Sequence, residues 1–154
     1  MAYADFEFYT NGFFGDMLSV ENAAKWLERA SDELDLITGG RLGAAFPRSK
    51  AEAASVKKAV CAVADALYMI DCQLRAVSAR PAEDGVYHGA VSAVSSGRES
   101  VSFAAAGSAS DASAYAAAAA DTGARNRLIR EIAARYIAGV ESSRGENLLY
   151  AGVV

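Results

Sequence analysis

The feature that most constrains this chain is a set of apolar residues that recurs at alternating intervals of four and three positions. Its members are Val56, Val60, Val63, Leu67, Ile70, Leu74 and Val77. This spacing puts the side chains along one side of an α-helix, in a seam that packs against other helices. Ser49 and Glu52 match a capping box at the start, and Pro81 ends the pattern. The sequence therefore predicts one helix from about residue 49 to 79, roughly 45 Å long.

Two further helices are predicted, one before and one after the long helix. The first begins at the N-cap Ser19 and ends at the TGG sequence of residues 38–40. Its apolar stripe, which Ser31 interrupts, contains Val20, Ala24, Leu27, Leu34 and Ile37. Asp121 or Thr122 caps the last helix, whose apolar face contains Leu128, Ile132, Tyr136 and Val140. The alanine-rich residues 104–121 are compatible with a helix from about Ser110 or with a loosely ordered connection.

Four aromatic residues lie within the first ten positions: Tyr3, Phe6, Phe8 and Tyr9. Such a cluster needs a surface to cover, which is either the chain's own helices or a neighbouring subunit. The sequence TNGFFGD at residues 10–16 follows directly, and its two glycines predict a turn before the first helix.

A stretch with a different period, VSAVSSGRESVSF, occupies residues 91–103. Apolar and polar residues alternate on both sides of a glycine-containing turn, which predicts a β-hairpin. An isolated hairpin is only marginally stable in water, so it must pack on the helices or pair with neighbouring subunits. The candidate inter-subunit residues are Val94, Gly97, Val101 and Phe103. Together these patterns predict a mainly α fold: a small helical bundle with a long central helix and one β-hairpin.

Charge is distributed unevenly along the chain. The formal net charge is −4, but residues 1–38 carry eight acidic residues against Lys25 and Arg29. Residues 122–138 carry four arginines against Glu131. Two solvated faces, pairing within the molecule and head-to-tail pairing between subunits all agree with this distribution. A net acidic chain of this kind disfavours tight binding of nucleic acid.

No pattern of catalytic or metal-binding residues is present in the sequence. His88 is the single histidine, and Asp65 and Asp71 on the long helix are expected to face solvent or a subunit contact. Cys61 and Cys72 are too far apart on one helix to form a disulfide, so we expect free thiols in a reducing cytoplasm. We expect no enzyme activity, no cofactor and no metal, and no signal peptide or membrane span is predicted.

The C-terminal sequence NLLYAGVV carries Leu148, Leu149 and Tyr150 after a polar spacer, residues 142–147. Apolar residues at a chain end need a place to dock. One alternative is that the tail, residues 142–154, folds back on the chain's own core. The other is that it docks on a partner, with Tyr150 as the anchor.

Five segments, taken in order, resemble the small head–tail connector (adaptor) proteins of tailed bacteriophages and prophages. The segments are AYADFEFYTNGFFG, LERASDELDLITGGR, VKKAVCAVADALYMI, VSAVSSGRESVSF and IAARYIAGVESSRGENLLYAGV. No single motif is diagnostic, and the resemblance depends on their order and spacing. It covers most of the chain apart from residues 78–89 and the alanine-rich run.

The resemblance implies a single connector domain, residues 1–154, that is a structural protein rather than an enzyme. Such proteins assemble as a homo-oligomeric ring, expected to be a dodecamer, under the portal protein. The ring extends the DNA channel and offers a surface to the next neck or tail protein. DNA passes through without specific binding, and no membrane is involved. The implied location is the virion neck, after assembly in the cytoplasm of the bacterial host.

Other functions remain open from the sequence. The chain could be a cytoplasmic helical regulatory or ligand-binding module that uses the seam of the long helix as a groove. It could also be another phage neck protein, such as a head-closure or tail-completion factor.

Overall fold

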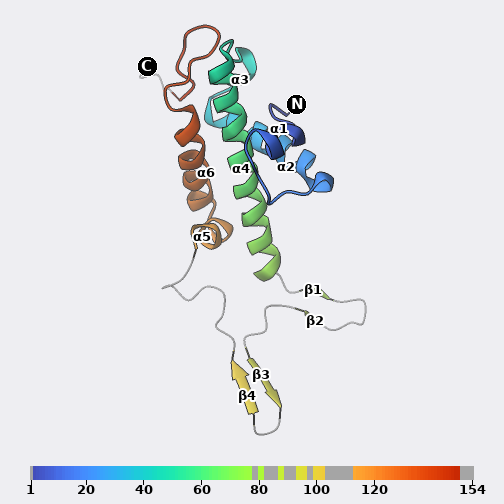
Figure 1. Ribbon diagram of the computed structural model, residues 1–154. Helices are drawn as coiled ribbons and strands as arrows, with labels where there is room; N and C mark the ends of the chain where they lie inside the picture. The colour runs from blue at the N-terminus through green and yellow to red at the C-terminus, as the bar shows by residue number, and fades with distance from the viewer. Residues whose placement is uncertain are drawn as a thin grey trace. The chain divides into compact units, whose positions relative to one another are not determined.

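The computed structural model describes residues 2–77, 80–81, 87–88, 93–96, 99–102 and 113–149 (Figure 1). The fold is mainly helical, as predicted. Its helices are α1 (Phe6–Asn11), α2 (Val20–Ile37), α3 (Arg41–Ala44), α4 (Lys50–Val77), α5 (Ala114–Ala120) and α6 (Thr122–Ile137). Two compact units can be distinguished, one of Met1–Tyr68 with Arg127–Val154 and the other of Met69–Asn126. No helix in the described part of the chain is long and apolar enough to cross a membrane.

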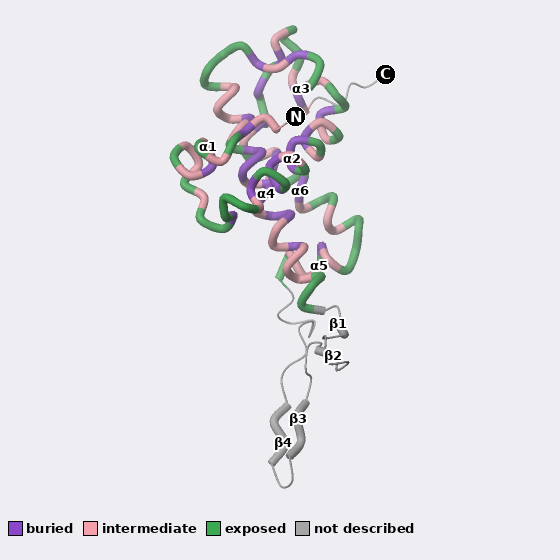
Figure 2. The backbone as a smooth tube through the Cα atoms, turned by 90° about the vertical axis from the view of Figure 1, so that its right-hand side faces the viewer, coloured by how far each residue is buried: buried purple, intermediate pink, exposed green. Residues whose placement is uncertain are grey.

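Helix α4 confirms the seam predicted from the sequence over most of its length. Val56, Val60 and Val63 are completely buried, and Leu67 and Ile70 are nearly so. Leu74 corrects the prediction, because 46% of this residue is exposed. In Figure 2 the buried residues gather on α2, α4 and α6. The seam is therefore occupied by the chain's own core up to Leu67 and leaves no open groove there.

Helix α2 has the predicted ends but a different buried face. It begins after Ser19, and Gly39 and Gly40 end it with left-handed φ angles of 60° and 76°. The buried residues are Ala23, Trp26, Leu27, Ala30, Ser31 and Leu34, whereas Val20 is 70% exposed and Ala24 is also exposed. The buried face differs from the predicted stripe because Ala23, Ala30 and Trp26 are part of it. Ser31 does not break the stripe, because its hydroxyl donates to the Leu27 carbonyl and accepts from the Tyr3 N–H.

Helix α6 also has the predicted start and a shifted face. The Asp121 carboxylate accepts a hydrogen bond from the Ala124 N–H at 2.6 Å, which confirms its role as a cap. The buried residues are Ile129, Ala133 and Ile137. Of the predicted face, Leu128, Ile132 and Tyr136 are only half-buried, whereas Val140, which follows the helix, is buried as predicted. Before α6, the Ser113 hydroxyl caps α5, so the last part of the alanine-rich stretch is helical.

Four short strands lie between α4 and α5. β1 (Arg80–Pro81) pairs with β2 (Tyr87–His88), and β3 (Ala93–Ser96) pairs with β4 (Glu99–Ser102). Both pairs are antiparallel, and Val94 lies opposite Val101 in the second. Gly97 and Phe103 lie outside the described residues. The hairpin of residues 91–103, as a unit that packs or assembles, therefore stays a prediction.

The segment after α6 folds back on the chain's own core. Leu148 is completely buried, and its N–H donates to the Val140 carbonyl at 3.0 Å. The Ser143 N–H donates to the Ala45 carbonyl at 3.1 Å, which ties the segment to the end of α3. Leu149 is half-buried against the same core. For Leu148 the structure thus corrects the partner-docking prediction, while Tyr150 and the residues after it lie outside the described residues.

We predict that Leu148→Ala destabilises the protein by about 2–5 kcal/mol, the usual cost of truncating a fully buried leucine. The matched control is Leu36→Ala, since Leu36 is 76% exposed and its truncation leaves the core intact. Chemical denaturation followed by circular dichroism measures both free energies of unfolding. Equal stability of the two variants would show that Leu148 is not part of the core.

Candidate functional site

The segment between α1 and α2, together with the first residue of α2, exposes three of the large apolar side chains of the described residues. We call residues 12–20 the apolar loop. Within it Phe14 is 82% exposed, Val20 70% and Met17 38%. Among the other residues whose exposure the structure describes, residues 2–76 and 113–149, only Leu36 and Leu74 are large, apolar and exposed to this degree. Clustered exposed apolar residues mark interaction sites, which makes the apolar loop the candidate functional site.

Phe14 is held in a conformation that costs energy. Its φ of 61° lies in the left-handed region, and Phe14 is the single non-glycine residue with positive φ in the described chain. For a residue with a side chain this costs about 1–2 kcal/mol, so the surroundings must enforce it. The Phe13 N–H bonds the Phe8 carbonyl, and the Gly15 N–H bonds the Tyr9 carbonyl, both at 2.9 Å. With its neighbours fixed on both sides, the Phe14 ring points into solvent.

The neighbouring Phe13 packs inward, against the core. Its ring centroid lies 6.0 Å from that of Tyr9 and 6.5 Å from that of Tyr136 on α6. Aromatic pairs at such distances are favourable beyond the area that they bury. The two adjacent phenylalanines therefore have different roles, because Phe13 anchors the loop to the core while Phe14 is presented outward.

Tyr9 holds the apolar loop against α4. The residue is completely buried, and its hydroxyl donates to Asp65 Oδ1 at 2.6 Å. The Tyr9 hydroxyl oxygen also accepts hydrogen bonds from the N–H groups of Met17 at 3.0 Å and Leu18 at 3.1 Å. Gly15 crosses the face of the ring so closely that a Cβ there would lie 2.2 Å from Tyr9 Cζ. Only glycine fits at this crossing.

This arrangement changes the titration of both partners. Burial and the hydrogen bond to Asp65 raise the pKa of Tyr9 to about 12, so the phenol stays a donor at neutral pH. Burial raises the pKa of Asp65, an effect that the bond from Tyr9 partly offsets. The prediction that Asp65 faces solvent or a subunit contact is wrong, because this carboxylate serves the chain's own N-terminal segment.

We predict that Asp65→Asn leaves the protein at least as stable as the native chain at neutral pH. The raised pKa means that the folded state holds this proton more tightly than the unfolded state, so stability is lost as pH rises through it. Asparagine keeps an acceptor for Tyr9 without the charge. The stability difference should shrink as pH falls through the raised pKa of Asp65, and it should reach its minimum below the ordinary carboxyl pKa of about 4, where Asp65 is protonated in both states.

Melting temperatures measured across the acid to neutral range test this expectation. Asp32→Asn, which changes an exposed carboxylate on α2, is the control for general charge effects. A destabilised Asp65→Asn protein whose deficit grows toward neutral pH would contradict it.

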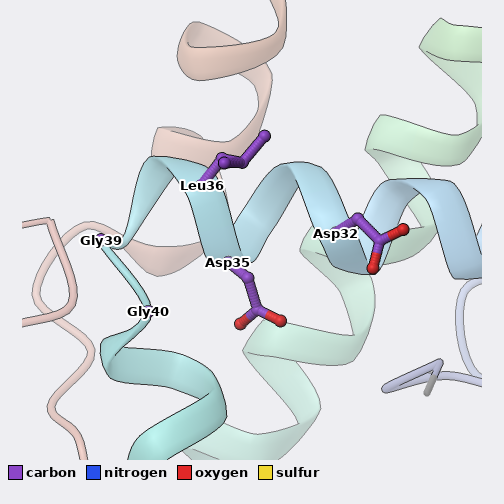
Figure 3. Close-up of a pocket in the computed structure, with 5 residues that line it drawn as sticks. All are labelled: Asp32, Asp35, Leu36, Gly39 and Gly40. Atoms are coloured by element: carbon purple, nitrogen blue, oxygen red, sulfur yellow. The ribbon is translucent and has the colours of Figure 1, made fainter.

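A second polar arrangement lies at the other end of α2. The Tyr3 hydroxyl donates to both carboxylate oxygens of Asp35, at 2.8 and 3.0 Å. Burial, together with this bond, raises the pKa of Tyr3. Beside the pair is a depression of about 450 Å³ lined by Asp32, Asp35, Leu36, Gly39 and Gly40. Figure 3 shows both carboxylates on one side of α2 and Leu36 on the other. Asp35 is already engaged by Tyr3, so this depression is a weaker candidate than the apolar loop.

The predicted site residues that the structure describes belong to two different compact units. Val94 and Val101 lie opposite each other in a strand pair, and Leu148 and Leu149 belong to the core of the other compact unit. Sequence reasoning missed the apolar loop, whose one signal was the pair of phenylalanines between glycines in NGFFG.

The described residues include two cysteines. Cys61 is buried, Cys72 is half-buried and both are free thiols. Burial raises the pKa of Cys61 to about 12, so this thiol is protonated and unreactive at neutral pH. No cluster of three or more metal-ligating residues occurs among the residues whose structure is described.

Comparison with known proteins adds no relative. No family model, no curated protein and no solved structure matches this chain.

Proposed function

We propose that this protein is a structural component of the neck of a tailed bacteriophage or prophage. In this role it forms a ring under the portal protein, extends the DNA channel and joins the capsid to the tail. The main support is the resemblance of five segments, in order, to head–tail connector proteins. The first of these segments, AYADFEFYTNGFFG, contains the aromatic residues that build and present the apolar loop.

The observation that carries the proposal is the exposed Phe14 on a loop fixed by Tyr9. An aromatic ring held outward at a cost in backbone energy favours a role in an interaction. In a subunit of an assembly, a surface that is rigid before binding loses less entropy when it binds.

The proposed ring has a defined set of contacts. Twelve copies are expected from the family, with the portal protein on one side and the next neck or tail protein on the other. The net charge of −4 disfavours a grip on the DNA that passes through the channel. The hairpin residues Val94, Gly97, Val101 and Phe103 would pair around the ring, and Tyr150 would dock on the portal or on the adjacent subunit.

The alternative of a regulatory or ligand-binding module is less well supported. It needed the seam of α4 as an open groove, and Val56, Val60 and Val63 are completely buried in the core. A head-closure or tail-completion factor remains the closer alternative, since it differs only in which neck protein it contacts.

The proposal predicts ring-shaped particles with a central channel at high protein concentration. Sedimentation velocity and negative-stain electron microscopy measure them, and a portal protein encoded beside this chain in the same genome should bind them. Val101→Asp should keep the native helicity but block rings, whereas Ser102→Asp, on the other face of the strand, should assemble. A chain that stays monomeric or dimeric and ignores the portal would contradict the proposed function. Normal rings from Val101→Asp would remove only the role of the hairpin.

A further inference from the structure

We infer that the apolar loop docks on the outer face of helix α6 of a second copy of this chain. This inference rests on the proposed ring and names the two surfaces that would form its subunit contact.

The first surface is apolar at its centre and acidic around it. Phe14 and Val20 are the most exposed apolar residues of the loop. Asp16 and Glu21 are exposed beside them in the sequence. The first 24 residues contain four acidic residues and neither lysine nor arginine. The occupant of this surface should therefore offer basic side chains around a place for an aromatic ring.

The second surface, the outer face of α6, has the complementary chemistry. Arg127, Glu131 and Ala134 follow one another at intervals of four and three residues, which puts them on one side of the helix. Ala138, the residue after the end of α6, continues this side, because its N–H donates to the Ala134 carbonyl at 3.0 Å. This side is turned away from the buried Ile129 and Ala133, and of its residues only Ala134 is half-buried. Arg130 and Arg135 flank it, and all three arginines are exposed. The alanine methyl groups leave room for a ring between the arginine side chains, and arginine stacks well on aromatic faces.

The loop cannot reach this face within its own chain. Phe13 fixes the loop at Tyr136, and the two alanines of the outer face are two positions from Tyr136, about 200° away around the helix. Tyr9 prevents the loop from swinging across, because its hydroxyl holds the Met17 and Leu18 amides.

The contact therefore joins two different surfaces of identical chains. Such a heterologous contact leaves an unused loop on one subunit and an unused α6 face on the other. Repetition closes into a ring when the rotation between subunits permits. The separation of acidic residues at the start of the chain from arginines near its end has the same explanation.

The substitution Phe14→Gly should weaken self-association without lowering the stability of the folded protomer. Glycine adopts a φ of 61° without strain, so the melting temperature of the protomer should stay the same or rise. Loss of the ring should weaken self-association by at least about tenfold, which sedimentation velocity measures. Leu36→Ala, the matched control, truncates another highly exposed apolar residue and should assemble like the native chain.

A mixing experiment tests the pairing of the two surfaces. The double variant Arg127→Glu/Ala138→Glu alters the outer face of α6 at exposed positions and leaves the loop intact. We expect it to fail to assemble alone, as Phe14→Gly does. An equimolar mixture of the two should form a one-to-one dimer, because one intact loop and one intact α6 face remain.

The outcomes separate this inference from the proposed function. Native rings together with normal rings from Phe14→Gly would overturn the docking inference and leave the neck function standing. Native rings with a mixture that stays monomeric would overturn the pairing with α6. A native chain that never self-associates, alone or on a portal, would overturn both.

Discussion

The hydroxyl group of Tyr9 joins parts of the chain that lie 56 residues apart. It donates to Asp65 on α4 and accepts from two consecutive amides in the apolar loop, while the Tyr9 ring is completely buried. The rings of Phe6 and Phe13 pack near the Tyr9 ring, at centroid distances of 6.2 and 6.0 Å. Without this hydroxyl two backbone donors and a half-buried carboxylate would lose their partner, which costs more than the bonds themselves contribute. This hydroxyl fixes the end of the loop at Met17 and Leu18, while backbone hydrogen bonds of Phe13 and Gly15 fix the part that presents Phe14.

The core around α4 provides the rigid base that this arrangement requires. Valine and alanine side chains of α4 pack with α2, α6 and the returning segment at Leu148. Close packing of this kind transmits position accurately, because it leaves little space for adjustment. The carboxylate of Asp65 extends from this base at a cost in solvation, which is visible in its raised pKa. The protein keeps the costly charge of Asp65 and the strained conformation of Phe14, both in the arrangement that holds the apolar loop. Its stability is therefore below the maximum, and what it gains is a surface with a defined shape.

Features that depend on local sequence were predicted well. The ends of α2, the cap at Asp121 and the buried seam of α4 follow from residues that are close in sequence. The buried faces of α2 and α6 were displaced, because Ala23, Ala30 and Ala133 pack closely although their hydrophobicity alone is weak. Leu74 was placed in the core by periodicity, and periodicity does not say where the neighbouring helices end.

The candidate site was harder to predict because its parts are distant in sequence. Nothing near Asp65 indicates a tyrosine partner, and NGFFG predicts a turn without telling which phenylalanine faces outward. The tail had two possible destinations, and only the contacts of Leu148 with Val140 and the core distinguish them.

Assembly through the apolar loop requires that this loop is rigid in the isolated subunit, before any partner binds. Amide hydrogen exchange at Met17 and Leu18 tests this most directly. Both amides should exchange about as slowly as amides in the buried part of α4, and Tyr9→Phe should make them fast while α4 stays protected. Fast exchange at both amides in the native chain would contradict the claim.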